Sequence, residues 1–265
     1  MDLRKSFDID AANYDKWRPR YCKELFNDII AYSKLNSETE CLEVGCGTGQ
    51  ATGPILETGS SVLAIELGVN FTNYTRDKFM SYKNFRIENA DFEKIPLQDH
   101  KFDLVFSGTA FHWIPEETGY PKVLNVLKSG GAIAVFWNKP TPESLDDPLH
   151  LKMQEVYEKY FGSGNVKKFE SQLSNPQERH EKIIRTLEKY GFVQAECRLY
   201  KQKREFNAED YVSLISTYSD HIALPEPGKS QLFNGIRAAI LSFNNSIKVY
   251  DTIELYMARK QLDLI

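Results

Sequence analysis

The stretch Cys41-Leu-Glu-Val-Gly45-Cys-Gly47-Thr-Gly49-Gln-Ala-Thr52 decides the fold of this chain. A short apolar run leads directly into glycines at every second position, and a helix-like segment follows. Because glycine lacks a Cβ, the backbone of such a loop can approach a ligand closely. The pattern therefore predicts a strand, a tight nucleotide-type binding loop and a helix.

The spacing of the glycines separates this loop from two other nucleotide-binding loops. A dinucleotide fingerprint, G-x-G-x-x-G, would need glycine at position 50, where the chain has Gln50. A Walker loop would end in Gly-Lys-Ser or Gly-Lys-Thr, and this stretch has no such ending. A nicotinamide oxidoreductase stays open as an alternative, and cofactor binding would test it.

Short apolar runs alternate with helix-like segments from residue 40 to residue 137, as in βαβ units that form a parallel sheet. The predicted strands are Cys41–Val44, Val62–Ile65, Phe85–Glu88, Phe102–Phe106 and Ala132–Trp137. The predicted helices are Gln50–Glu57, Val69–Tyr82 and Glu116–Leu127. We expect Lys128-Ser-Gly-Gly131 to end the third helix.

The alternation ends at Asn138-Lys-Pro-Thr-Pro142. Helices are predicted over Pro148–Phe161 and Gln177–Tyr190, and later within Ala208–Tyr218 and Lys229–Phe243. Two long β-like runs are expected to pair antiparallel at one edge of the sheet. These runs are Phe192–Phe206 and Ile247–Lys260.

Composition narrows the function classes. The chain has 265 residues, 42% apolar and 26% charged, and a net charge of −4. Nonspecific nucleic-acid binding needs clustered Lys and Arg, and a membrane span needs about 20 apolar residues; the sequence has neither. The four cysteines, Cys22, Cys41, Cys46 and Cys197, lack paired spacing. We expect a cytoplasmic protein with reduced thiols, no metal site, and no nucleic-acid or membrane partner.

Glu43 followed by Gly-x-Gly-x-Gly resembles motif I of the class I S-adenosylmethionine-dependent methyltransferases. Further motifs follow in the family's order: Glu66 at the end of the second strand, Glu88-Asn-Ala-Asp91-Phe92, Phe102–Trp113 and Leu127–Gly131. The loop after the fourth strand lacks the Asn/Asp-Pro-Pro-Tyr of amino-methylating nucleic-acid enzymes. It also lacks the clustered Asp and Asn of metal-dependent catechol enzymes.

The leader, residues 7–21, contains Tyr14-x-x-x-Arg18-Pro and is similar to the type 11 subfamily, near the trans-aconitate methyltransferases and quinone-biosynthesis C-methyltransferases. In that subfamily the leader folds over the bound cofactor. The chain departs from the family at Ser129, where proline is usual. Residues 138–260 match only loosely, which leaves the methyl acceptor open.

The resemblance implies an α/β fold: a doubly wound, mostly parallel seven-stranded sheet of the Rossmann-like methyltransferase type, with an antiparallel edge strand and helical lid insertions. We expect a single domain over residues 1–265 with a cofactor-binding core at 36–137. The expected lid pieces are residues 1–20, 138–174 and 207–245.

The resemblance also implies a cofactor, S-adenosylmethionine, with S-adenosylhomocysteine as its product. Glu66 is expected to accept from the ribose hydroxyls, because ligands of open α/β sheets bind at the strand ends. Its alternative is a solvated residue that begins the next helix. Asp91 would accept from the adenine amino group and Phe92 would cover the ring. The expected cofactor-binding set is Tyr14, Arg18, Glu43, Gly45, Cys46, Gly47, Gly49, Glu66, Leu67, Ala90, Asp91, Phe92 and Ser107.

Methyl transfer from a sulfonium is an in-line displacement, so positioning matters most. A general base helps when the small-molecule acceptor is a hydroxyl or an activated carbon, and a carboxylate needs none. The candidates are His112 and His221, each with a structural or capping role as the alternative. Tyr14 and Trp137 could close over the methyl group or pack in the core. A catalytically silent S-adenosylmethionine binder remains a second possibility.

Overall fold

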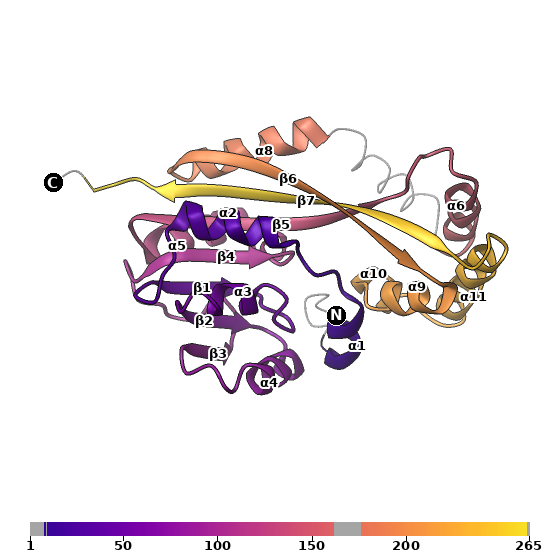
Figure 1. The fold of residues 1–265 in the computed structure, drawn as a ribbon, viewed down its shortest axis with the longest axis horizontal. Coiled ribbons are helices and arrows are strands. Elements are labelled where there is room, and N and C mark those ends of the chain that lie inside the picture. Colours follow the sequence, from indigo (N-terminus) through magenta and orange to yellow (C-terminus); the bar gives the residue numbers. More distant parts are fainter. Residues whose placement is uncertain (1–7, 9, 162–175, 264–265) are drawn as a thin grey trace. The chain divides into compact units, whose positions relative to one another are not determined.

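The computed structural model describes residues 8, 10–161 and 176–263, and it divides into two compact units (Figure 1). We call Pro19–Asn138, His180–Tyr200 and Ile253–Ile265 the core unit. We call Met1–Arg18, Lys139–Arg179 and Lys201–Thr252 the insert unit. Within the described residues, no helix has both the length and the apolar character needed to cross a membrane.

The strands of the described residues form one seven-stranded sheet in the order β3-β2-β1-β4-β5-β7-β6. Their bounds are β1 Glu40–Val44, β2 Ser61–Glu66, β3 Phe85–Asn89, β4 Phe102–Gly108, β5 Leu127–Thr141, β6 Phe192–Phe206 and β7 Ile247–Lys260. Strands β3, β2, β1, β4 and β5 are parallel neighbours. The arrows of β6 and β7 point in opposite directions (Figure 1). The predicted mixed sheet with an antiparallel edge is confirmed.

Side chains of the central strands alternate between two buried clusters, as the two-residue period of a strand requires. Leu42 and Val105 belong to one cluster, whose helical members come from α5 (Glu116–Val126) and α8 (Pro176–Lys189). Leu104 and Phe106 belong to the other, with α2 (Lys23–Ser33) and α3 (Thr52–Leu56). Burial on both faces explains why these strands read as continuous apolar runs.

The structure corrects the prediction for Lys128-Ser-Gly-Gly131. Helix α5 ends at Val126, one residue before its predicted end, and Lys128-Ser-Gly-Gly131 do not cap it but lie inside strand β5, which begins at Leu127. The register with β4 shifts here, because Phe102 pairs with Leu127 whereas Leu104 pairs with Ala132. The extra residues form a bulge, and Gly130 takes a φ of 74° within it. The helix thus ends where the sequence predicts, but the two glycines belong to an irregularity of the following strand and not to a helix cap.

The insert unit has its own apolar core. Within its described residues, this unit contains the helices α1 (Ala11–Trp17), α6 (Pro148–Phe161), α9 (Ala208–Ile215), α10 (Ser219–Ile222) and α11 (Gly228–Leu241). Leu149 and Met153 of α6, Ile215 of α9 and Ile236 of α11 are buried in this core. The unit contains the described parts of the three predicted lid pieces, except residues 19, 20 and 138, which belong to the core unit. Residues 1–7, 9 and 162–174 of those pieces lie outside the described residues.

Candidate functional site

The glycine loop after β1 has the backbone that its sequence predicts. Gly45, Gly47 and Gly49 have φ angles of 69°, 56° and 80°, in the left-handed region that side chains disfavour. A Cβ at Gly45 would lie 2.5 Å from the Cβ of Ala110, and one at Gly49 would lie 2.4 Å from Cε2 of Phe79. Packing as well as conformation therefore requires glycine at the two ends of the loop.

Glu66, at the end of β2, fixes the loop from its amide side. Its Oε2 accepts from the backbone N of Gly47 and its Oε1 accepts from the backbone N of Gly68, both at 2.8 Å. Glu66 is 8% exposed, so it is not the solvated residue of the alternative hypothesis.

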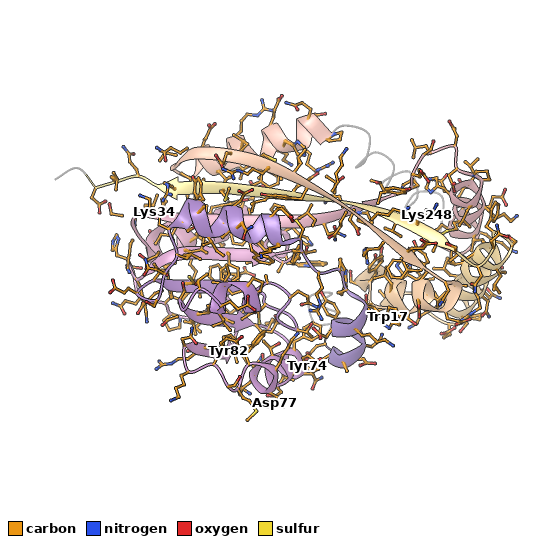
Figure 2. All side chains as sticks on the ribbon, viewed as in Figure 1. Trp17, Lys34, Tyr74, Asp77, Tyr82 and Lys248 are labelled. Carbon is orange, nitrogen blue, oxygen red and sulfur yellow. The ribbon has the colours of Figure 1, made fainter. Side chains whose placement is uncertain are left out.

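Helix α4 (Val69–Lys78) fixes the same loop from its carbonyl side. The hydroxyl of Thr75 donates to Gly47 O at 2.7 Å, and Nζ of Lys78 donates to Thr48 O at 2.9 Å. The Lys78 ammonium also lies 5.9 Å from the ring centre of Tyr74, which Figure 2 labels. Sequence reasoning missed Thr75 and Lys78. Their three-residue spacing, which places both on one helix face, is the signal that could have found them.

Glu43 lies inside the sheet beneath the loop. Its side chain is 1% exposed, and Thr52 Oγ1 donates to its Oε2 at 2.6 Å. Burial raises the pKa of Glu43 to about 8, the Thr52 hydrogen bond opposes this rise, and the charge of Glu66 adds to it. Glu43 is thus a mostly protonated acid at neutral pH. Its predicted contact with the cofactor remains a prediction.

The raised pKa of Glu43 makes stability depend on pH. The folded state holds this proton up to about pH 8, whereas the unfolded chain releases it near pH 4.5. The contribution of Glu43 is therefore fully present below pH 4.5 and is lost as the pH rises toward 8. Between pH 4.5 and 7 the loss is on the order of 3 kcal/mol.

We expect Glu43→Gln to remove this pH dependence, because the neutral amide keeps the shape and an oxygen for Thr52. Urea unfolding at pH 5 and pH 8 should show the variant more stable than the wild type at pH 8 only. Glu40→Gln is the matched control, since the Glu40 side chain on the same strand is 43% exposed. Equal pH slopes for the wild type and Glu43→Gln would contradict the buried-acid interpretation.

The segment after β3 lies next to the same strand end. Ala90 N donates to Glu66 O at 2.9 Å, and Asn89 Nδ2 donates to Leu67 O at 3.0 Å. Asp91 Oδ1 accepts from Glu93 N at 3.0 Å and so begins a turn. Phe92 is 5% exposed and packs in the core. The backbone thus joins the predicted ribose and adenine segments, while the adenine contacts stay predictions.

Two other predicted cofactor residues are buried by the protein itself. Ser107, at the end of β4, is 1% exposed and donates its hydroxyl to Val44 O at 2.7 Å. Cys46 is 5% exposed, and burial raises its thiol pKa well above the usual value. Their side chains hold the strand ends and the loop, and a cofactor contact through their backbone remains a prediction.

His112 lies in the short helix η2 (Phe111–Trp113) after β4. Nε1 of Trp137 donates to His112 Nδ1 at 3.0 Å. An indole nitrogen is only a donor, so Nδ1 must be the unprotonated nitrogen and the neutral ring carries its proton on Nε2. In this arrangement His112 can donate a hydrogen bond through Nε2, but its basic lone pair is engaged by Trp137. The geometry favours a donor over a general base.

The remaining predicted residues, Tyr14, Arg18 and His221, lie in the insert unit. The Arg18 guanidinium lies between two rings, 4.8 Å from the centres of both Tyr14 and Tyr218, and Nη2 donates to Thr217 O at 3.0 Å. Arg18 thus ties the end of α1 to the residues after α9. His221 is 5% exposed. Cofactor contacts of Tyr14 and Arg18 stay predictions.

Part of this chain matches a family of known proteins. Residues 42–135, from β1 to β5, match the family described as "Methyltransferase domain". These residues form a methyltransferase domain of the type 11 family. The match confirms the predicted family and its S-adenosylmethionine cofactor. Within the described residues, no group of three His, Cys, Asp or Glu side chains could hold a metal ion.

Methyltransferases of other organisms are similar to this chain over different shares of its length. An uncharacterized methyltransferase of Schizosaccharomyces pombe is 26% identical over 87% of this chain and 85% of its own length. A malonyl-[acyl-carrier protein] O-methyltransferase of Marinomonas sp. is 31% identical, but over only 49% of each chain. The chain thus spans about half of that second relative.

The fold also has counterparts among solved structures. Phosphoethanolamine N-methyltransferase 2 of Haemonchus contortus, in complex with phosphomonomethylethanolamine and S-adenosylhomocysteine, has a TM-score of 0.58 at 14% identity. That alignment covers 98% of this chain and 60% of the other. It supports the Rossmann-like methyltransferase fold.

Proposed function

We propose that this protein transfers the methyl group of S-adenosylmethionine to a small-molecule acceptor by in-line displacement. The observation that carries the proposal is the loop of Gly45, Gly47 and Gly49, held by Glu66 on its amide side and by α4 on its carbonyl side. A loop already fixed before binding needs little ordering when the cofactor arrives, which favours tight and oriented binding. Bound S-adenosylmethionine would supply an electrophilic methyl group at a sulfonium.

Different residues of the core unit would contact different parts of the cofactor. Glu66 would accept from the ribose hydroxyls while it keeps its backbone partners at Gly47 and Gly68. Asp91 and Phe92 would contact the adenine, as the family resemblance implies. His112, with its proton on Nε2, would donate a hydrogen bond to an oxygen or nitrogen near the reacting atoms. The chemistry thus rests mainly on orientation and exclusion of water.

We also propose that the insert unit is the acceptor-binding part, in keeping with the predicted lid pieces at residues 1–20, 138–174 and 207–245. Except for residues 19, 20 and 138, their described parts belong to one compact unit that has its own apolar core. This grouping supports the proposal, because segments that are separate in sequence have to fold together before they can close over a ligand as one body.

Hydrogen exchange in the presence of S-adenosylhomocysteine tests both proposals. We expect protection of amides at Gly45–Gly49 and after β2 and β3, since bound ligand suppresses local opening. We also expect protection in the insert unit if it closes on the cofactor. Protection of the loop alone would reject the lid, and no protection of the loop would reject the cofactor site.

A further inference from the structure

The segment Asp91–Ile95 forms a compact turn after β3, within the core unit. Asp91 O accepts from the backbone N of Lys94 at 3.0 Å and from that of Ile95 at 2.9 Å. Asp91 Oδ1 accepts from Glu93 N at 3.0 Å, as an aspartate that begins a turn does. All three bonds lie within the turn. They fix its own shape, and its position against the rest of the core unit depends on other contacts.

Lys122 of α5 reaches this turn from a distant part of the chain. Its Nζ donates to Ile95 O at 2.6 Å and, in a longer bond, to Glu93 O at 3.4 Å. The same ammonium lies over the ring of Phe92, 5.1 Å from the ring centre. Carbonyl oxygens and the face of an aromatic ring both attract a cation. Lys122 thus ties the turn to α5 through a single charged group.

The charge of Lys122 also acts on Asp91, the residue predicted to contact the adenine. Burial lowers the pKa of Lys122, and the negative charges of Asp91 and Glu93 oppose this shift. The attraction between Lys122 and the Asp91 carboxylate is only partly screened by water, because the Asp91 side chain is 16% exposed. Lys122 therefore steadies both the backbone of the turn and its carboxylate.

A second lysine near Asp91 has a different environment. Lys94 Nζ lies 3.2 Å from Asp91 Oδ2, but the Lys94 side chain is 82% exposed. An ion pair of this kind is screened by water and contributes little. Lys122 is half-buried and contacts the backbone as well. The support of the turn thus comes mainly from Lys122.

We infer that Lys122 is a positioning residue for recognition of the cofactor's adenine, because it holds the turn that carries Asp91. The inference rests on the proposed function, in which Asp91 accepts from the adenine amino group. Lys122 would act through Asp91. A recognition group has to be held within about 0.5 Å of its productive place by neighbours that are themselves fixed. A turn outside the strands needs such a neighbour more than a strand end does.

Two ligands that differ at the adenine amino group test the inference. S-inosylhomocysteine carries an oxygen where S-adenosylhomocysteine carries this group, so a carboxylate that accepts from the amino group would repel it. By calorimetry on the full chain, we expect the adenosyl ligand to bind about ten- to a hundredfold more tightly, the worth of a hydrogen bond to a charged group. Lys122→Met should lower this ratio by roughly threefold or more, because Asp91 is no longer held in place.

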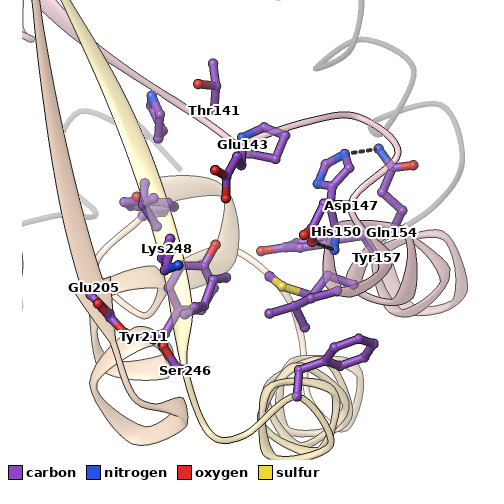
Figure 3. Close-up of a pocket in the computed structure, with 18 of the residues that line it drawn as sticks. Thr141, Glu143, Asp147, His150, Gln154, Tyr157, Glu205, Tyr211, Ser246 and Lys248 are labelled. Atoms are coloured by element: carbon purple, nitrogen blue, oxygen red, sulfur yellow. Dashed lines mark hydrogen bonds between the residues drawn. The ribbon is translucent and has the colours of Figure 1, made fainter.

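Two variants remove the same charge elsewhere and serve as controls. Lys94→Met removes the exposed lysine of the same turn. Lys248→Met removes a lysine of the insert unit, where Lys248 lines a cavity (Figure 3). Both should keep the adenosyl-to-inosyl ratio within about twofold of the wild type, as expected for exposed charges. Thermal unfolding checks that each variant folds, and Lys122→Gln replaces Lys122→Met if that variant does not.

The ratio separates a positioning role from a merely structural one, since general loosening would weaken both ligands by the same factor. An unchanged ratio in Lys122→Met, or an equal fall in Lys94→Met, would overturn the inference. A wild-type protein that binds both ligands equally would overturn it too, because Asp91 would then not recognise the amino group, while the cofactor assignment would stand. If the wild type binds neither ligand, the proposed function itself is wrong.

Discussion

Gly47→Val is expected to abolish binding of S-adenosylmethionine, a loss of at least about 100-fold in affinity. Gly47 has a φ of 56°, and a β-branched residue there costs roughly 1 to 3 kcal/mol of backbone strain. The valine side chain would also lie on the face of the loop where the cofactor would contact the backbone. Isothermal titration calorimetry on the folded variant measures the effect.

Gly59→Val is the matched control for this prediction. Gly59 has a φ of 87° in the turn between α3 and β2, outside the loop, so it carries a similar strain. We expect both variants to lose stability in thermal unfolding but only Gly47→Val to lose the cofactor. An affinity of Gly47→Val within threefold of the wild type would show that the loop does not contact the ligand.

Glu66→Gln is expected to weaken S-adenosylmethionine binding by about 1 to 3 kcal/mol, because an ionised acceptor becomes a neutral one. The structure adds a second reason. Glutamine has one acceptor oxygen, so its NH₂ group would face the N–H of either Gly47 or Gly68, both of which Glu66 now accepts. The loop should therefore loosen even without cofactor.

Two measurements separate these causes. Calorimetry gives the affinity, and hydrogen exchange of the Gly47 and Gly68 amides in the unliganded protein gives the loop rigidity. Glu88→Gln is the control, since Glu88 is an exposed acid on β3 with the same charge change. An unchanged dissociation constant in Glu66→Gln would show that Glu66 does not contact the cofactor. Exchange of the Gly47 and Gly68 amides as slow as in the wild type would show that Glu66 does not hold the loop.

The strands and most helices could be predicted because local sequence determines them. The runs Phe192–Phe206 and Ile247–Lys260 are strands with the predicted bounds, since long β-like runs between turn residues leave few alternatives. The bulge at Gly130 could not be predicted, because glycines after a helix usually end it. Only the pairing with β4 reveals that they are part of a strand.

Part of the site could be predicted because it also depends on local sequence. The glycines and Glu66 follow directly from strand ends, whereas the roles of Thr75 and Lys78 depend on how α4 packs on the loop. The state of His112 depends on Trp137, 25 residues away. The hydrogen bond between Tyr157 and His221 joins residues 64 positions apart in the sequence, and no local sequence pattern predicts it.

The most direct test of the central claim is release of S-adenosylhomocysteine from S-adenosylmethionine by the purified full chain. The assay would use a panel of phenols, alcohols, amines, carboxylates and quinones. We predict time-dependent release with at least one acceptor, and none from Gly47→Val. Bound S-adenosylmethionine that is never converted, with any acceptor, would contradict methyl transfer and leave a silent binder; binding of a nicotinamide cofactor in its place would contradict the cofactor assignment itself.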